Sequence, residues 1–445
     1  MSFTRRNFLY SGVAGIATGL LASTKAFAQR LRPAGASGPP PKPLPARRRS
    51  AARTRVITPN GTTLPYRMVD GVKEFHLIAE PVRREFVQGL EVNCWGYNGV
   101  TPGPTIEAFE GDRVRLLVTN KLPEGTSVHW HGFILPNGMD GVSGLNQPKI
   151  KPGETYAYEF TLQQTGTLMY HPHFDEMTQI AMGMHGFFVI HPRDASVSRV
   201  DRDFAIFLNE WFIKPGTATP DPTVMLDFNT FTMNGRVFPG TEPMLVRTGD
   251  RVRIRLANLT MDSHPIHIHG HAFYVTGTDA GPIPQSGWWP ENTVNVPVGT
   301  TRDIEFTADN PGDWAFHCHK THHVMNQMGH DLPNLLGIDA SGPQQRVDEL
   351  VPGAMVMGTD GMGAHAEHRG MMPQPRNSIA MLGGQGPYGV IDMGGMFNIV
   401  KVRDDLDYGR DPGWYQQPPG TSARRVDSMS TTPTQQPGAH EGHGK

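Results

Sequence analysis

The feature that most constrains this chain is an internal duplication. The segments "EGDRVRLLVTNKLPEGTSVHWHG" and "TGDRVRIRLANLTMDSHPIHIHG" share GDRVR, and in each the glycine, Gly111 or Gly249, lies 18 residues before the first histidine of an HxHG. Further along, Glu159 and Glu305 each belong to an EFT motif and each precede an HxH by 12 residues. Two matched landmarks at matched spacing predict that one domain occurs twice.

Each copy has the pattern of a β-sandwich. Alternating segments at 113–119, 156–161, 251–257 and 303–307 are separated by Gly, Pro and Asn turns. The chain has 51 Gly and 39 Pro and lacks a long amphipathic helical stretch, which favours strands with many turns. We therefore expect an all-β protein with similar domains at 53–195 and 196–405.

The ends of the chain have a different character. Residues 1–28 contain Arg5 and Arg6, a short Gly/Ala-rich apolar run and a small-residue site at 26–28, which resembles a bacterial twin-arginine export signal. The run is too short and too rich in glycine to span a bilayer comfortably. Residues 29–52 form a Pro-rich basic linker, and residues 406–445 a polar tail. We expect a periplasmic or secreted protein with no transmembrane segment after signal removal.

Net charge and cysteine content limit the possible partners and the disulfide bonds of this chain. Lys+Arg 40 against Asp+Glu 42 gives a net charge of −2, so no overall positive field indicates a nucleic-acid partner. Two cysteines are too few for a disulfide scaffold. Cys94 is predicted to be a buried free thiol, and a Cys94–Cys318 bridge is the alternative.

The two copies differ together at three matched positions. The second copy has His264, Cys318 and His323 where the first has Thr126, Pro172 and Met177. A thiolate and two imidazoles, with a weak axial thioether, are the ligands of a blue-copper electron-transfer site. The second copy is therefore predicted to hold such a site, with Met328 as the axial candidate.

Eight further histidines form four HxH pairs at the duplicated landmarks. Residues i and i+2 of a strand point to the same face, so each pair can aim two imidazoles at one place. Eight imidazoles at a domain interface could hold several copper ions. The pairs are His129/His131, His171/His173, His267/His269 and His317/His319.

In their order, the motifs "HWHG", "HPH", "HPIHIHGH" and "HCHKTHHVMNQM" resemble the multicopper oxidases over residues 70–330 and a late strand near 396–403. With two repeats, the chain is most similar to the two-domain (small) laccases. The resemblance implies cupredoxin-like Greek-key domains and four copper ions per subunit, with type 1 copper in the second domain. It implies that His129 and His267 bind type 2 copper, and that the type 3 pair is bound by His131, His171, His173, His269, His317 and His319.

The resemblance also implies an activity. A donor would be oxidised one electron at a time at the type 1 copper, and O2 would be reduced to water at a trinuclear cluster. That cluster would lie between neighbouring subunits of a homotrimer, although spacing alone leaves a cluster between the two domains of one chain also open. Asp140 stands where small laccases carry an acidic residue, and we interpret it as a proton donor or relay; the alternative is that it caps a turn beside a glycine.

A Met-rich insertion, at about 331–391, departs from the family pattern. Its thioethers are suited to Cu(I), although methionine also fills irregular apolar gaps. The donor is thus predicted to be a phenol or Cu(I), with Mn(II) and a partner protein also open, and the insertion could cover the type 1 site. The methionines and histidines of the insertion that could bind a metal are Met355, Met357, Met362, His365, His368, Met371, Met372 and Met381.

Two other classes remain open from the sequence. A copper nitrite reductase is also a two-domain trimer, but in that family the type 1 cysteine lies in the first domain, where this chain has Pro172. A non-enzymatic copper storage protein would explain the methionines, yet it would not need four histidine pairs in register.

Overall fold

The computed structural model describes residues 54–194, 199–326, 376–379 and 383–425, with the dipeptides 345–346 and 349–350. The predicted export signal, the linker, Met328 and the methionines and histidines named in the insertion lie outside these residues. In the described part of the chain, no helix is long and apolar enough to cross a membrane.

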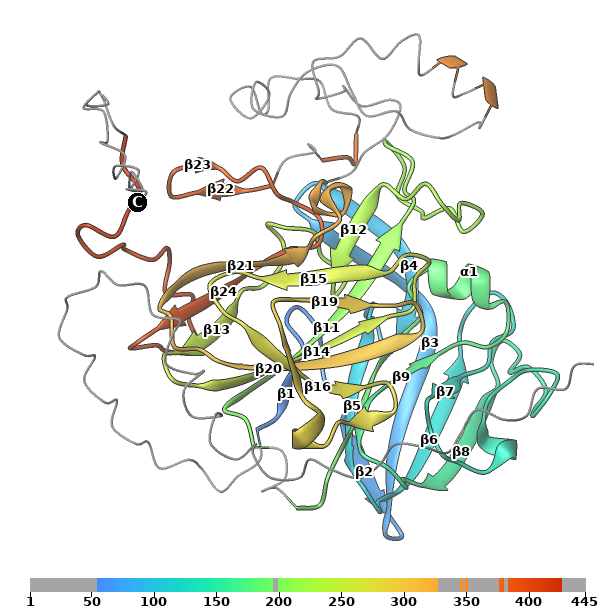
Figure 1. Cartoon of the computed structure of the whole chain (residues 1–445). Coiled ribbons are helices and arrows are strands. Elements are labelled where there is room, and N and C mark those ends of the chain that lie inside the picture. Colours follow the sequence, from blue (N-terminus) through green and yellow to red (C-terminus); the bar gives the residue numbers. More distant parts are fainter. Residues whose placement is uncertain are drawn as a thin grey trace, which may run out of the picture. The chain divides into compact units, whose positions relative to one another are not determined.

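The first repeat folds into two facing sheets (Figure 1). One sheet has the order β2-β3-β6-β8, with β4 paired to β3, and the other has the order β5-β10-β9-β7. A short helix, α1 (Glu176–Ala181), follows β9, and a 3-10 turn, η1 (Asn137–Met139), follows β7. The strands are β2 (Tyr66–Val69), β3 (Val72–Val87), β4 (Leu90–Tyr97), β5 (Gly103–Phe109), β6 (Arg113–Asn120), β7 (His129–His131), β8 (Thr155–Thr161), β9 (Gly166–His171) and β10 (Gly186–His191).

The second repeat also folds into two sheets. The larger follows β1-β11-β14-β20-β16-β17, with β12 paired to β11 and β18 to β16, and the smaller follows β13-β24-β21-β15-β19. Its strands are β1 (Val56–Ile57), β11 (Arg202–Trp211), β12 (Thr230–Met233), β13 (Met244–Arg247), β14 (Arg251–Asn258), β15 (His264–Ile268), β16 (Phe273–Thr278), β17 (Gly281–Pro282), β18 (Trp289–Glu291), β19 (Thr293–Val296), β20 (Thr300–Thr307), β21 (Gly312–Cys318) and β24 (Phe397–Arg403). The minor elements are η2 (Gln285–Gly287), η3 (Thr321–Val324) and the hairpin β22 (Gln385–Gly386) and β23 (Gly389–Val390).

The strand pairings confirm the all-β fold and the duplication. The parallel pair β5–β10 matches β13–β24, and the antiparallel pairs β10–β9 and β9–β7 match β24–β21 and β21–β15. In the facing sheets, β3–β6–β8 matches β11–β14–β20 in direction. Because β24 enters between β13 and β21, the chain returns to this sheet after the insertion, as the red strand beside orange β21 shows (Figure 1).

The same GDRVR strand occupies two different environments. In β6, buried and more exposed residues alternate, as expected for one face on the core and one toward solvent. In β14, every residue after Arg251 is buried, and Ala257 lies in one apolar cluster with residues of β9 and β10 of the first repeat. An apolar seam joins the two repeats at this place: Val56, Met169, Phe187, Val189, Ala205, Phe207, Ala257 and Leu259.

Segments at both ends of the described chain attach to the second repeat. β1 pairs in parallel with β11, although it precedes the first repeat in sequence. In the predicted tail, the hydroxyl of Tyr408 donates a hydrogen bond to Asp250 at 2.7 Å, and Lys401 forms an ion pair with Asp411 at 2.5 Å. The first part of the tail therefore packs on the second sandwich.

Candidate metal centres

Three side chains of the second repeat converge in its interior. His264 begins β15, Cys318 ends β21 and His323 lies in η3, and all three are fully buried. Nδ1 of His323 lies 3.1 Å from Nδ1 of His264 and 3.6 Å from Sγ of Cys318. Three donor atoms within 4.8 Å of one another form a compact set. We call it the mononuclear set.

Burial controls the protonation of this mononuclear set. It lowers the pKa of His264 to about 3 and that of His323 to about 2, so both imidazoles are neutral with lone pairs available. It raises the pKa of the Cys318 thiol to about 12. A thiolate at this place therefore needs a bound cation, and metal binding would release the thiol proton. Buried thiolate and imidazole donors fit a copper ion.

The outer nitrogen of His323 faces a carboxylate. Oδ2 of Asp262 lies 3.5 Å from Nε2, and Nζ of Lys320 lies 3.1 Å from Oδ1 of the same residue. The ring of Phe231 stacks on His323 at a centroid distance of 4.2 Å. A proton on Nε2 leaves Nδ1 free to face Cys318, and a carboxylate near Nε2 favours the tautomer that a metal at Nδ1 requires, although no hydrogen bond joins them in the described structure.

A second grouping, of Asp262, His322 and His323, uses the same ring. A neutral imidazole has one lone pair for a metal, so His323 cannot serve this grouping and the mononuclear set together.

Sequence reasoning missed both Asp262 and Glu210, whose Oε1 accepts a hydrogen bond from the Asp262 backbone N–H at 2.6 Å. Burial, followed by the charge of Asp262, raises the pKa of Glu210 to about 7. The position of Asp262, two before His264, was the available signal.

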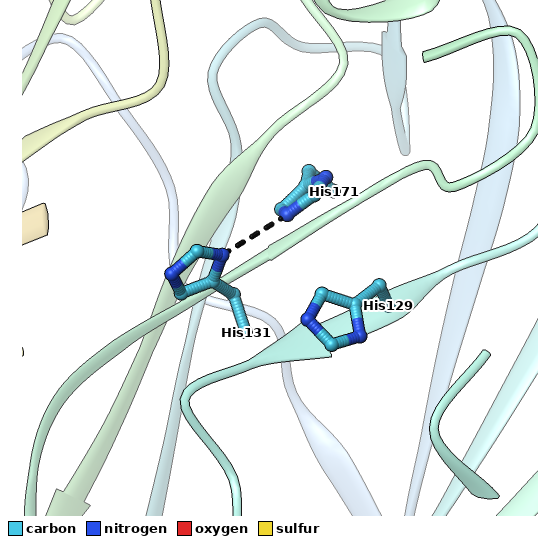
Figure 2. Close-up of side chains that lie close together, drawn as sticks. All are labelled: His129, His131 and His171. Atoms are coloured by element: carbon cyan, nitrogen blue, oxygen red, sulfur yellow. Dashed lines mark hydrogen bonds between the residues drawn. The ribbon is translucent and has the colours of Figure 1, made fainter. Parts of the chain in front are cut away.

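Four histidines of the first repeat form the first tetrad: His129, His131, His171 and His173. Strand register places His129 directly opposite His171 on β7 and β9. Nδ1 of His131 lies 3.2 Å from Nε2 of His171 (Figure 2). The His129 ring is central, with centroids of the other three 5.3 to 5.7 Å away. Donor atoms of three of these rings are close enough for a shared metal.

Four histidines of the second repeat form the second tetrad: His267, His269, His317 and His319. His267 lies opposite His317 on β15 and β21, which is the register of the first tetrad. Nε2 of His269 lies 3.1 Å from Nε2 of His317. The central ring is that of His267, with the other centroids 4.9 to 5.7 Å away. The duplication thus extends to the arrangement of the imidazoles.

Backbone carbonyl groups orient several of these rings. Nδ1 of His129 donates to the Asp140 carbonyl at 2.8 Å, and Nδ1 of His267 donates to the Asn292 carbonyl at 2.7 Å. Nδ1 of His171 and of His317 each donate to the carbonyl of the neighbouring position, 172 or 318. These bonds leave Nε2 of each ring as the donor atom for a metal.

Protonation and exposure favour metal binding by both tetrads. Burial lowers the pKa of His171 to about 3 and that of His317 to about 4, which keeps these rings neutral. His269 and His319 are exposed. Within the described residues, every ring contact and hydrogen bond between these eight histidines stays inside one tetrad. One chain therefore presents two separate halves, each able to accept further ligands.

Asp140 lies directly beside the first tetrad. It follows η1 as the C-cap residue, and its Oδ1 lies 3.4 Å from Nδ1 of His129. Gly141 follows with φ +86°, and a Cβ there would collide with the carbonyl of Val128. The backbone of this turn is thus held against β7. Asp140 therefore lies in a turn beside a glycine and also close to the first tetrad.

The cysteines do not form a disulfide. Cys94 and Cys318 are both buried free thiols, and Cys94 packs in a separate apolar cluster with Trp211 and Val237.

Comparisons with known proteins agree with this arrangement. Two family models, both described as multicopper oxidase, match residues 79–195 and 215–335, together a little more than half of the chain. Copper resistance protein A of Escherichia coli is 41% identical over 125 residues, covering 28% of this chain and 20% of that protein. Laccase-1 of Botryotinia fuckeliana is 36% identical over 239 residues, covering 50% of this chain and 40% of that protein.

A solved structure resembles most of the described fold. The blue copper oxidase from Nitrosomonas europaea is 26% identical, with a TM-score of 0.54, over 74% of this chain and 85% of that chain. The chain spans less than half the length of the curated relatives described above. From the two family-model matches, the repeated sandwich and the histidine motifs, we conclude that this chain belongs to the multicopper oxidase family.

Proposed function

We propose that this protein is an oxidase that couples one-electron oxidation of a reducing substrate to reduction of O2 to water. The observation that carries the proposal is the position of Cys318 on β21, between His317 and His319. A residue of the mononuclear set is thereby bonded through the backbone to two residues of the second tetrad. When bound, copper would supply one-electron transfer at the mononuclear set and O2 binding and reduction at the cluster.

Geometry and resemblance support the ligand assignments, and Met328 is assigned from the sequence alone. We assign His264, Cys318, His323 and Met328 to the type 1 copper. We assign the two central rings, His129 and His267, to the type 2 copper, because each occupies the same place in its tetrad. The remaining six histidines, which are His131, His171, His173, His269, His317 and His319, would hold the type 3 pair. This predicts four copper ions per subunit.

The separation of the two tetrads supports a homotrimer. A complete cluster needs the first tetrad of one copy and the second tetrad of another, and a contact of this head-to-tail kind can close into a ring. The exposed rings of His269 and His319 fit such a contact.

Metal content and mass test the function and the assembly together. The expected result is four copper ions per chain, blue colour and the native mass of a trimer. Two ions per chain would favour a nitrite reductase, and a variable number without blue colour would favour copper storage. A four-copper monomer would contradict the proposed assembly.

For Asp140, we propose proton delivery to the oxygen-reducing cluster. The carboxylate lies beside His129, where it could hold and release a proton. Asp140→Asn is expected to slow O2 reduction about 100-fold or more without slowing reduction of the type 1 copper, whereas Asp140→Glu retains more activity. Equal rates in stopped-flow reoxidation of the wild type and Asp140→Asn would exclude the role.

The donor is proposed from the relatives' names and the chemistry of the chain. Laccase and copper-resistance names among the relatives favour a phenol or Cu(I). The decisive comparison is O2 consumption with Cu(I) and with a phenol, in the wild type and after deletion of 345–385. Selective loss of Cu(I) oxidation supports the methionines as a copper site, and a gain in phenol oxidation supports a cover over the type 1 site.

We also propose twin-arginine export to the periplasm or outside the cell, from residues 1–28.

A further inference from the structure

In each repeat, charged side chains on the outer face of the larger sheet form a row of ion pairs across neighbouring strands. We call each row a ladder, and the two ladders have the same arrangement. In the first repeat, Arg115 on β6 pairs with Glu74 at 3.1 Å and with Glu159 at 2.7 Å. In the second, Arg253 on β14 pairs with Asp203 at 3.4 Å and Glu305 at 2.6 Å, in the same register. The Arg115 side chain is 26% exposed and that of Arg253 is 8% exposed.

The second ladder has one additional rung. Arg255 lies opposite Asp303, where the first repeat has Leu117 opposite Ala157. Arg255 also donates two hydrogen bonds to Asp203, each 2.8 Å long. Arg255 and Asp203 are almost completely buried. We call Arg255, Asp303 and Asp203 the seam rung.

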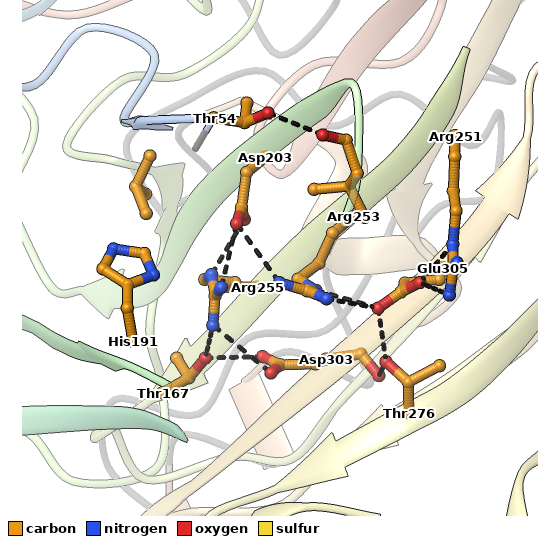
Figure 3. Close-up of polar contacts among 12 residues, drawn as sticks. Thr54, Thr167, His191, Asp203, Arg251, Arg253, Arg255, Thr276, Asp303 and Glu305 are labelled. Atoms are coloured by element: carbon orange, nitrogen blue, oxygen red, sulfur yellow. Dashed lines mark hydrogen bonds and ion pairs between the residues drawn. The ribbon is translucent and has the colours of Figure 1, made fainter. Parts of the chain in front are cut away.

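One side chain of the first repeat, that of Thr167, is hydrogen-bonded to the seam rung (Figure 3). The hydroxyl of Thr167 accepts a hydrogen bond from Nη1 of Arg255 at 2.6 Å and donates one to Oδ1 of Asp303 at 2.6 Å. The backbone carbonyl of Thr167 accepts a third, from the hydroxyl of Thr301, at 2.8 Å. Three directional bonds thus fix β9 of the first repeat on β14 and β20 of the second.

The location connects this contact to the metal centres. Thr167 lies on β9, the strand that ends with His171 of the first tetrad. Burying charges is costly, and apolar replacements are often as stable, so a buried ion pair is better suited to selecting one geometry than to adding stability. The apolar seam beside it can tolerate small shifts, whereas a two-way hydroxyl bond cannot.

We propose that the seam rung and Thr167 set the angle between the two repeats, and that this angle allows tetrads of neighbouring copies to meet. The inference rests on the proposed function. A head-to-tail ring closes only at one rotation between subunits, and each subunit carries its two tetrads on different repeats. An error in the angle between the repeats would therefore displace the histidines of every shared cluster. Metal binding would suffer, because ligand atoms must lie within about 0.5 Å of the productive geometry. Thr167, Arg255 and Asp303 are positioning residues in this scheme.

The most direct test is Thr167→Val, which keeps the side-chain shape and removes the hydroxyl. The expected result is an unchanged blue absorption from the mononuclear set, together with at least a tenfold loss of trimer affinity and a loss of the other three copper ions. Thr167→Ser keeps the hydroxyl and should restore both. The readouts are copper per chain, visible absorption and native mass against concentration.

A second variant removes the seam rung itself. Arg255→Leu with Asp303→Ala introduces the side chains of the first repeat at the rung without changing net charge, and Thr167→Val removes the hydroxyl that bonded to the rung. Its matched control is Arg115→Leu with Glu159→Ala, which removes an ion pair from the exposed ladder and should leave copper content and mass unchanged. If Thr167→Val and this triple variant remain trimers with four copper ions, the inference is wrong.

The outcomes separate this inference from the proposed function. A wild-type protein that is not a four-copper oligomer would refute the proposed function, and the inference with it. A wild-type four-copper trimer whose Thr167→Val variant loses blue absorption and cluster copper in equal measure, with lower thermal stability, would assign Thr167 a general structural role and overturn the inference alone.

Discussion

At the scale of single residues, the two cysteines provide a matched comparison. Cys318 lies 3.6 Å from the ring of His323, whereas Cys94 lies in an apolar cluster with Trp211. Cys318→Ser is expected to abolish the blue absorption and substrate oxidation, because a hydroxyl does not replace a thiolate as a soft ligand. Cys94→Ser should retain colour and activity. Visible absorption and copper analysis of both variants check this, and a blue Cys318→Ser protein would contradict the assignment.

Asp262 provides a second prediction at this scale. Its carboxylate lies 3.5 Å from Nε2 of His323 and would hold the tautomer that directs Nδ1 inward. Asp262→Asn is expected to lower copper affinity at the mononuclear set or donor oxidation by about 10- to 100-fold, as for other groups that orient metal ligands. Asp262→Glu serves as the control that retains charge. Identical copper affinity and donor kinetics in Asp262→Asn and the wild type would show that the tautomer is held by other contacts.

At the scale of elements, the turn after η1 positions Asp140 against β7. Gly141 has φ +86°, and a side chain there would meet the carbonyl of Val128. Gly141→Ala is expected to lower the unfolding free energy by about 1–3 kcal/mol and to displace the carbonyl that orients His129.

This variant should therefore bind less type 2 copper while keeping its blue colour. Gly138→Ala, in the same turn and with open space at its Cβ, is the control. Electron paramagnetic resonance distinguishes the two kinds of copper. An unchanged type 2 signal in Gly141→Ala would mean that the turn adapts without moving His129.

Strand prediction from sequence succeeded at this scale because strands are encoded locally. The segment expected at 113–119 is observed as β6 at Arg113–Asn120, and that expected at 251–257 as β14 at Arg251–Asn258. The segment expected at 303–307 is longer, at Thr300–Thr307. Its added residues pair with the end of β14, and one of them, Thr301, also bonds Thr167 of the other repeat.

At the scale of the whole molecule, buried histidines couple stability to pH in the copper-free protein. Burial lowers the pKa of His171, His185 and His264 to about 3, whereas the unfolded chain has values of about 6.5. Below about pH 6.5 the unfolded state binds protons that the folded state does not, so the unfolding free energy falls as pH falls, until about pH 3. Each histidine contributes up to about 1.4 kcal/mol per pH unit.

Glu210 acts in the opposite sense, because its raised pKa of about 7 lets the folded state hold one proton as pH falls. Several histidines outweigh this single carboxyl group. Urea unfolding with a chelator, at about pH 7 and about pH 5, measures the balance above the range where most carboxylates titrate. Equal unfolding free energies at the two values would contradict the prediction, and copper loading should reduce the loss by competing for the imidazoles.

The sequence by itself determined the all-β class, the duplication and the residue types available for metal binding. These properties depend on spacing and on the two-residue period of strands, which are local. The alternation predicts that both histidines of each HxH share a face, and the strand pairing of the structure then places His129 opposite His171 and His267 opposite His317. Only the tertiary structure decided which sheet face is covered. As a result, the side chain of Arg253 is buried, whereas the equivalent side chain of Arg115 is partly exposed. It also decided that the two tetrads stay apart within one chain, because the relative placement of two sandwiches depends on contacts such as Thr167 with Asp303 that no local pattern contains.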